Sequence, residues 1–276
     1  MPGLLNLGCG GRYSTDAIWT NLDMGAADRH VIAHDMRRRL PFDNNIFDGV
    51  YHSHVLEHFT QTDGRRFLGE CHRVLKPGGV LRVAVPDLAQ ICRLYLEAKE
   101  KSETGPDEWK GRYDWMLLEL YDQTVRTTTG GEMASHLRRP DLKDTDFILG
   151  RIGNVGRQIM ESAAGDAAAQ ARATSWRQWA SRFRHGIGKR FKLALLNEHE
   201  RQALELGLFR LSGEVHQWMY DDYSLRRLLE SASFADVRRC SATESRIRNW
   251  NSYGLDVGSD GVEHAPSSLY MEGCKP

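Results

Sequence analysis

The chain has 276 residues, of which 41% are hydrophobic and 27% are charged, and its 37 basic residues balance 37 acidic ones. This length suffices for one large domain or two small ones, and the composition is ordinary for a soluble globular protein. The zero net charge excludes a global electrostatic attraction to nucleic acid or to a membrane, so any such attraction has to be local.

The cysteines and the apolar runs restrict the class of protein further. Five cysteines are scattered through the chain without a C-x-x-C pair, at positions 9, 71, 92, 240 and 274. This spacing argues against a zinc ribbon or a disulfide framework and suits a reducing compartment. The chain shows neither a basic-apolar signal region at its start nor an apolar run near the roughly 18 residues of a membrane span. We therefore expect a cytoplasmic protein without a transmembrane segment.

Short apolar runs alternate with turns through the first hundred residues. Continuous apolar runs are typical of parallel strands that are covered on both faces, and they predict strands over residues 3–7, 18–23, 30–36, 47–53 and 80–85. A helical repeat predicts a helix over residues 62–75, with Thr62 or Asp63 as its N-cap. The following "KPGG" is expected to end this helix in a turn. A second helix is expected to start at Pro86, with the proline in its first turn.

The connections between the first three predicted strands are short. Ten residues lie between the first and second strands and six between the second and third. A crossover between parallel strands needs at least about 10–12 residues, including its helix. The first two crossover helices are therefore expected to be reduced to a turn or lost.

Residues 101–213 differ in character from what precedes them, since they are charged, helical and rich in loops. "TTTGGEM" (127–133) reads as a glycine-bearing loop or hinge. Residues 167–197 contain no acidic residue and place Trp176, Trp179 and Phe183 on one helical stripe. This stretch fits a solvated helix. It also fits a contact with an anionic or membrane-interfacial partner, such as a lipid-linked or phosphorylated glycan.

The last part of the chain returns to a regular α/β pattern. It predicts an amphipathic helix over residues 223–234 and two closing strands over 235–243 and 267–275. We expect one α/β core formed by residues 1–100 and 214–276. Residues 101–213 are then a helical insertion that forms a lid and the substrate pocket.

The glycine-rich turn and the acid after it form the first candidate binding site. Glycines after a buried strand let the backbone approach a ligand, and Asp23, thirteen residues after Gly10, ends the next strand. A carboxylate at that position can accept both hydroxyls of a ribose. A dinucleotide site would need G-x-G-x-x-G at the start of a helix and an acid about 20 residues further on. The missing helix and the shorter gap favour a ligand without phosphates.

These segments and their order resemble a class I S-adenosylmethionine-dependent methyltransferase. The resemblance rests on "LLNLGCGG", "NLD", "AHDM", "LPFDNNIFDGVYHSHVLEHF", "ECHRVLKPGGVLRVAVPDL" and "SLYMEG". It covers residues 3–97 and about 214–275 and is similar to the small-molecule subgroup often seen beside glycan and natural-product genes. It implies a Rossmann-like sheet, mostly parallel with an antiparallel last strand, with reduced first helices and a large helical insertion.

The resemblance also implies S-adenosylmethionine as the cofactor and S-adenosylhomocysteine as the product. The implied cofactor contacts run from the first strand to just past the fourth: Asn6, Gly8, Cys9, Gly10, Asp23, Met24, Asp35, Met36, Ser53 and His54. The glycine loop passes the methionine portion, and Asp23 holds the ribose. Met24 lies beside the adenine, and Asp35 and Met36 contact the edge and face of the adenine. Ser53 and His54 line the sulfonium end. Asn6 departs from the pattern, because the family usually has an acid at that position.

"SHVLEHF" (53–59) carries an H-x-x-E-H spacing that has three interpretations. On one helix face it could bind zinc as in inverted zinc peptidases, but here it directly follows a predicted strand. Some O-methyltransferases of quinone biosynthesis and of small RNAs resemble this site and use E-x-x-E-H to bind a divalent ion near the acceptor hydroxyl. Histidine in place of the first acid suits softer metals better than Mg²⁺. In the third interpretation, which we adopt here, no metal binds, Glu57 and His58 orient the segment and His54 borders the cofactor.

A methyltransferase mainly aligns donor and acceptor and excludes water, and a hydroxyl acceptor also benefits from a general base. Histidine has the most suitable pKa for this role. The candidates for catalysis are His54, Asp87 and His216, and His136 is a further candidate base. Glu214 is expected to orient His216. For each histidine the alternative is a hydrogen-bonded structural role.

We therefore expect an S-adenosylmethionine-dependent methyltransferase that acts on a small molecule or a glycan, at oxygen and with a histidine base. An anionic acceptor would suit the basic stretch 167–197. Nucleic acid is not expected as a partner, because the chain has neither a basic balance nor a nucleic-acid-binding motif. One alternative is a catalytically inactive cofactor-binding regulatory or scaffold protein, motivated by Asn6 and the missing helices. The others are N- or C-methylation and non-methyl chemistry in the same fold.

Overall fold

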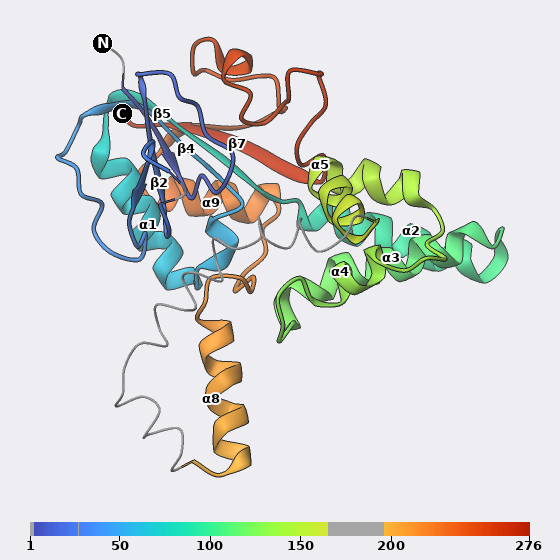
Figure 1. Ribbon diagram of the computed structural model, residues 1–276. Helices are drawn as coiled ribbons and strands as arrows, with labels where there is room; N and C mark the ends of the chain where they lie inside the picture. Colours follow the sequence, from blue (N-terminus) through green and yellow to red (C-terminus); the bar gives the residue numbers. More distant parts are fainter. Residues whose placement is uncertain (1–2, 27, 165–195) are drawn as a thin grey trace.

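The computed structural model describes residues 3–26, 28–164 and 196–276 and is built around one seven-stranded sheet (Figure 1). The strand order is β3-β2-β1-β4-β5-β7-β6. Strands β1 to β5 pair in parallel, and β7 is antiparallel to both of its neighbours. This confirms the expected Rossmann-like α/β fold, mostly parallel with an antiparallel last strand. The strands are β1 (Leu4–Leu7), β2 (Trp19–Asp23), β3 (Val31–Ala33), β4 (Phe47–Ser53), β5 (Leu75–Pro86), β6 (Ala235–Cys240) and β7 (Ser268–Cys274).

The first two crossover connections contain no helix in the part of them that the structure describes, which is all but residue 27. This agrees with the prediction from their length. Strand β3 is shorter than the predicted 30–36. Its carboxyl end is followed by a turn in which the side chain of Asp35 accepts a hydrogen bond from the backbone N–H of Arg37 (3.0 Å). Such a side-chain-to-backbone bond favours a turn over continued strand.

Helices α1 (Gln61–Val74) and α9 (Asp222–Ser231) cover one face of the sheet (Figure 1). Their apolar residues form one core cluster with strand residues such as Leu5, Leu22 and Val50. A short 3₁₀ helix, η1 (Leu56–His58), links β4 to α1.

The opposite face of the sheet is covered by the loop between β6 and β7, residues 241–267, which includes the 3₁₀ helix η2 (Trp250–Tyr253). Side chains of the loop and of four strands form a second core cluster: Leu4, Trp19, Tyr51, Val80, Ile247, Trp250 and Leu255. A mostly parallel sheet has to be covered on both faces. The loop therefore supplies the cover on this face, where the first two crossovers provide no helix.

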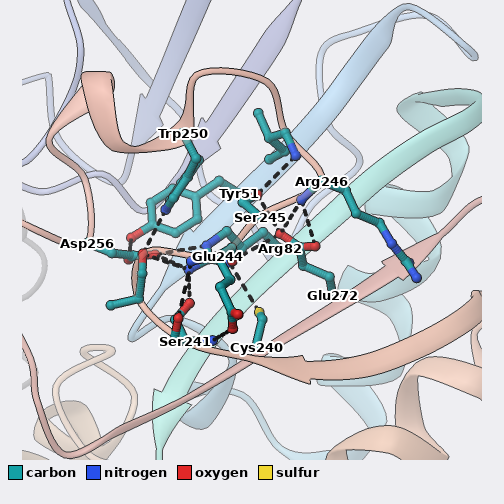
Figure 2. A network of polar contacts seen from close by, with 12 residues as sticks. Tyr51, Arg82, Cys240, Ser241, Glu244, Ser245, Arg246, Trp250, Asp256 and Glu272 are labelled. Carbon is teal, nitrogen blue, oxygen red and sulfur yellow. Dashed lines mark hydrogen bonds and ion pairs between the residues drawn. The ribbon is translucent and has the colours of Figure 1, made fainter.

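Arg82 of β5 holds this covering loop to the sheet (Figure 2). Its buried guanidinium donates to the carboxylates of Asp256 (2.8 Å) and Glu272 (3.1 Å). It also donates to three backbone carbonyls of the loop, those of Ser241, Ala242 and Glu244. The buried charge is thus paired and fully hydrogen-bonded, as a buried ion requires.

The remaining helices are α2 (Leu88–Thr104), α3 (Glu108–Val125), α4 (Gly131–Leu137), α5 (Thr145–Ala164) and α8 (Glu198–Arg210). Helices α2 to α5 gather at one end of the sheet, around a third core cluster that includes Ile91, Trp115 and Ile148 (Figure 1). The predicted boundary at residue 101 falls inside α2, so the division into core and insertion stays a prediction. Gly131 begins α4, so only the first part of 127–133 is a loop.

Helix α8 extends away from the rest of the molecule, and none of its residues is buried (Figure 1). It begins at a capping box in which Asn197 and Glu200 exchange hydrogen bonds (both 2.9 Å). The basic aromatic stretch 167–197 lies, apart from its last two residues, outside the described residues. Within the described ranges, no helix combines the length and the apolar character that crossing a membrane requires.

Three predicted details around α1, β5 and α2 are wrong. Thr60, rather than Thr62 or Asp63, caps α1, since its hydroxyl accepts a hydrogen bond from the backbone N–H of Asp63 (3.1 Å). Asp87 caps α2, while Pro86 is the last residue of β5. "KPGG" lies within β5, where the pairing with β4 shifts register. Gly78 has a left-handed backbone (φ 79°), which lets the chain form a bulge at this point and continue in the sheet.

The cap of α1 makes a direct prediction. Thr60→Ala is expected to lower the free energy of unfolding by about 1 kcal/mol, because one orphan N–H of the first turn loses its acceptor. Thr62→Ala is the matched control. Thr62 is an exposed residue inside the helix, where alanine is the better helix former, so its change should be close to zero. Urea denaturation of both variants measures the difference, and equal effects would contradict the assignment of Thr60.

Candidate functional site

A cavity of about 300 Å³ opens at the carboxyl ends of the central strands, which is where ligands bind in open α/β sheets. Its volume is at the lower end of the usual range for small-molecule sites. Six of the ten predicted cofactor residues line it: Gly8, Asp23, Met24, Asp35, Met36 and His54. The sequence placed these residues at the ends of separate strands, and the parallel sheet brings the ends together.

Gly8 forms a wall of the cavity that only glycine can provide. Its backbone is left-handed (φ 66°), and a Cβ atom built on it would lie 2.3 Å from Cγ2 of Val55. Gly10 is also left-handed (φ 53°), and its N–H donates to Oδ2 of Asp23 (2.8 Å). The glycine loop is therefore closed against the end of β2, with backbone rather than side chains facing the cavity.

Two acidic residues on neighbouring strand ends have different surroundings. Among the residues that the structure describes, Asp23 accepts hydrogen bonds from two backbone N–H groups alone, those of Gly10 and Gly25 (3.3 Å). Asp35 forms an ion pair with Arg37 (2.9 Å). Burial raises the pKa of Asp35, but the hydrogen bonds and charge of Arg37 outweigh it, so the pKa lies below its ordinary value. Asp23 is thus the carboxylate whose remaining acceptor capacity is open to a ligand.

Four predicted cofactor residues are not part of the cavity lining: Gly10, described above, and Asn6, Cys9 and Ser53. Asn6 is buried, and its amide donates to the backbone carbonyl of Arg12 (3.1 Å), which secures the chain after the glycine loop. Burial, together with the charge of Asp23, raises the pKa of the Cys9 thiol to about 12, so this cysteine stays protonated and is not a nucleophile. Ser53 is the last residue of β4.

Both ring nitrogens of His54 have a polar neighbour. Its backbone is left-handed (φ 55°), and its N–H donates to the carbonyl of Ala84 (2.9 Å). The side chain lines the cavity, with Nε2 2.8 Å from Oγ of Ser268 and Nδ1 3.1 Å from a carboxylate oxygen of Glu57. The unusual backbone thus turns the imidazole into the cavity wall in one fixed orientation.

Behind His54, η1 and the segment after α8 are joined through their backbones. The carbonyl of Glu57 accepts hydrogen bonds from the N–H groups of Gln217 (2.7 Å) and Trp218 (3.2 Å). The N–H of His216 donates to the carbonyl of Gln123 in α3 (2.9 Å). These bonds place the His216 ring against that of His58, with the ring centroids 4.8 Å apart. Glu57, His58 and His216 therefore form one cluster next to the cavity.

The cluster combines an ionised acid with neutral imidazoles. Burial raises the pKa of Glu57, but the contact with His54 and the nearness of His58 and His216 outweigh it and bring the pKa to about 2. Burial lowers the pKa of His216 to about 3 and also lowers that of His58. At neutral pH the cluster consequently carries the negative charge of Glu57.

The other predicted catalytic residues lie away from the cavity lining. Asp87 caps α2 and accepts a hydrogen bond from Arg239 (2.8 Å), so its carboxylate is already engaged. Glu214 accepts a hydrogen bond from the N–H of Gly130 (2.8 Å) and lies 3.7 Å from Arg126. It therefore does not orient His216, and that expectation is wrong. His136 borders a different cavity, formed by α3 and α4.

Several residues that the sequence analysis did not identify complete the cavity wall. They are Arg37, Gln217 and the segment Arg210–Gly213, which runs from the last residue of α8 into the turn after it. His58, named above only as orienting its segment, also lines the cavity. Arg37 also donates to the carbonyl of Leu211 (3.4 Å), which connects the turn to the end of β3. In the sequence, Arg37 directly follows the predicted strand 30–36, and Arg210–Gly213 ends the segment 101–213 that was expected to form the substrate pocket.

Comparison with protein families gives one match. Residues 5–83 match the family described as "Methyltransferase domain". Together with the strand order of the sheet, this match supports a class I S-adenosylmethionine-dependent methyltransferase. No curated protein matches the chain.

Three similar solved structures illustrate the range of matches. The [4+2]-cyclase SpnF is 23% identical over 30% of this chain and 39% of its own, with a TM-score of 0.24. A chain of the complex between the Haloferax volcanii Trm112 methyltransferase activator and the putative methyltransferase is 13% identical over 100% and 83%, with a TM-score of 0.36. An S-adenosylmethionine-dependent methyltransferase from Clostridium acetobutylicum is 13% identical over 34% and 46%, with a TM-score of 0.27.

The chain thus spans less than half of the length of the first and third of these structures. Because all three TM-scores are below 0.5, these alignments bear neither on the fold nor on the reaction.

Proposed function

We propose that this protein transfers the methyl group of S-adenosylmethionine to an oxygen of a small molecule or a glycan and releases S-adenosylhomocysteine. The observation that carries the proposal is the glycine loop, which closes on Asp23 at the carboxyl edge of the sheet and leaves a cavity of about 300 Å³ beside it. The family match over residues 5–83 supports the same cofactor. The five cysteines, all free thiols, support a cytoplasmic setting.

The residues around the cavity fit this cofactor. A Cβ at Gly8 would collide with Val55, so the wall is open to close backbone contact with the methionine portion. Asp23 has open acceptor capacity for the two ribose hydroxyls. Met24 and Met36 offer polarisable side chains to the adenine at the neighbouring strand ends. Asp35 retains its pair with Arg37 and borders the adenine position.

S-adenosylmethionine, when bound, supplies an electrophilic methyl group on a sulfonium. The chain's own task is to hold the acceptor in line with that methyl group and to exclude water. His58, Gln217 and the segment Arg210–Gly213 also line the cavity, and we assign the acceptor to the part of the wall that they form. The presence of Arg210–Gly213 in this wall supports the proposed role of residues 101–213 as lid and substrate pocket.

Among the candidate bases, the geometry favours His54. It alone of His54, Asp87 and His216 lines the cavity. With Nδ1 next to Glu57, its Nε2 is the nitrogen that can accept a proton, and an acceptor hydroxyl would replace Oγ of Ser268 as the donor to it. The negative charge of Glu57 beside Nδ1 favours the tautomer of His54 that carries its proton on Nδ1.

The first test is calorimetry of the purified protein with S-adenosylmethionine, and the absence of binding would refute the proposal. The second is release of S-adenosylhomocysteine over a panel of sugars, nucleotide sugars and phenols. Binding of the cofactor without turnover of any acceptor would favour the regulatory or scaffold alternative.

His54→Asn tests the base, because asparagine accepts a left-handed backbone and retains a polar side chain. We expect kcat to fall by about 10²–10⁴-fold, the usual contribution of a general base, with little change in cofactor affinity. His136→Asn, at the other cavity, is the matched control and should leave both quantities unchanged. If the two variants had equal kcat, His54 would not be the base.

A further inference from the structure

We propose that Glu57, His58 and His216 bind a divalent transition-metal ion beside the cavity. This inference replaces the metal-free interpretation of the H-x-x-E-H segment. It does not depend on the proposed cofactor, because it rests on contacts among these three side chains and their neighbours.

The three side chains are close enough to share one ion. Each offers one ligand atom, and the three atoms lie within 4.8 Å of one another. In a tetrahedral site with metal–ligand bonds of about 2.1 Å, the ligand atoms are about 3.4 Å apart. Closing the site therefore requires the ligand atoms to approach one another by at most about 1.4 Å.

Glu57 is the strongest single indication of a bound cation. Its side chain is fully buried, and neither carboxylate oxygen has a hydrogen-bond partner among the described residues. His54 Nδ1 is 3.1 Å from one oxygen, but its N–H is not directed at that oxygen in hydrogen-bond geometry. Over residues 3–26, 28–164 and 196–276, no Lys or Arg forms an ion pair with Glu57. A buried carboxylate with unused lone pairs is unfavourable unless a cation is bound there.

Arg126 does not fill this role. It is the basic side chain whose charge affects both histidines of the cluster. Its guanidinium is instead shared between Asp122 (4.0 Å) and Glu214 (3.7 Å). The negative charge of Glu57 is therefore left to a ligand.

Each of the two histidines has a ring nitrogen that is free to bind a metal. His58 Nδ1 is 3.4 Å from the carbonyl of Val215, and an N–H directed there leaves Nε2 with a free lone pair. Ligating histidines usually make such a bond to a backbone carbonyl through the nitrogen that does not bind the metal. His216 is 5% exposed, and its buried Nδ1 has no hydrogen-bond partner within the described part of the chain. The backbone bond from Gln217 to Glu57 fixes the two ligand-bearing segments relative to one another.

The donor set indicates the class of metal. Two imidazoles and one carboxylate favour Zn²⁺ and neighbouring transition metals, whereas Mg²⁺ and Ca²⁺ prefer oxygen ligands throughout. Three protein ligands also leave a coordination position open. Because His58 lines the cavity, a small ligand held there would be able to complete the coordination.

Calorimetric titration of the tag-free, chelator-treated full chain tests the site, with ZnCl₂ and MgCl₂ as separate probes and no S-adenosylmethionine present. We expect one equivalent of Zn²⁺ per chain, no detectable binding of Mg²⁺, and a higher Tm with Zn²⁺. Co²⁺ is expected to give the d–d absorption of a protein-bound site. E57Q, H58N and H216N should each weaken Zn²⁺ binding by about a hundredfold. Loss of a residue that only hydrogen-bonds to a metal ligand usually weakens metal binding by about 10–100-fold, and loss of a ligand itself should cost at least as much.

H136N is the matched control and should bind Zn²⁺ as the unchanged protein does. E57Q keeps the side-chain volume and removes a buried charge, so it remains informative if a histidine variant fails to fold, and circular dichroism checks the fold of each. The proposal is overturned if the unchanged protein takes up no stoichiometric Zn²⁺, or if E57Q binds it equally well. Calorimetry with S-adenosylmethionine on the same sample separates this result from the proposed function, since either ligand can bind without the other.

Discussion

Arg82→Met is expected to lower the free energy of unfolding by about 3–5 kcal/mol, the usual cost of removing one partner of a buried ion pair. The change leaves Asp256 and Glu272, both buried, without the guanidinium that neutralises them. Three carbonyls of the covering loop lose their donor as well. Methionine fills much of the arginine volume, so the loss would report charge and hydrogen bonding rather than a cavity.

Urea denaturation of Arg82→Met and Arg238→Met makes the comparison. Arg238 contacts the same carboxylate, Glu272, but at 3.5 Å and with 46% of its side chain exposed. Because water reaches the Arg238 guanidinium, we expect this pair to contribute about 1 kcal/mol or less. If Arg238→Met were as destabilising as Arg82→Met, burial would not be the reason for the effect. Further replacement of Asp256 and Glu272 by their amides in the Arg82→Met protein should recover part of the lost stability.

Asp23→Asn is expected to weaken binding of S-adenosylmethionine by about 10–100-fold, since hydrogen bonds to a charged acceptor contribute about 1.5–3 kcal/mol. The asparagine keeps an oxygen that can still accept from the N–H of Gly10, so the glycine loop is retained. What is lost is the second acceptor and the charge that we assign to the ribose hydroxyls. Calorimetry with the cofactor measures the change.

Asp48→Asn is the control for charge. Asp48 also accepts a hydrogen bond from a backbone N–H, that of Gly3 (2.8 Å), but it lies near the start of β4, at the opposite edge of the sheet. Its pair with Lys76 is partly exposed, so the change should be small in stability and absent in cofactor affinity. Equal affinity of Asp23→Asn and the unchanged protein would refute the ribose assignment.

The parallel strands could be predicted because their apolar runs are continuous, and their ends locate the candidate cofactor site. Gly8, Asp23 and His54 each follow or end such a run, and parallel pairing alone brings them to one edge. The errors arose where two local signals competed. Thr60 and Thr62 are both plausible caps in the sequence, and the choice depends on where the chain leaves η1.

Contacts between distant segments could not be predicted from local patterns. The covering loop has no periodicity, and its partner Arg82 stands inside an apolar run that reads simply as a strand. His216 meets Glu57 and His58 because backbone hydrogen bonds join segments about 160 residues apart. For the same reason Glu214 seemed suited to orient His216, whereas its side chain bonds to Gly130 at the start of α4.

The loop between β6 and β7, which covers the second face of the sheet, limits where the chain can be cut into fragments that fold. Strands β1, β2 and β4 are complete by residue 53, but the side chains that shield Trp19 and Tyr51 come from residues 247–255. During synthesis this apolar surface stays uncovered until nearly the whole chain has been made. We therefore expect that residues 5–83, the segment that matches the methyltransferase family, do not fold on their own, because a fragment cut at these borders exposes one apolar face of its sheet.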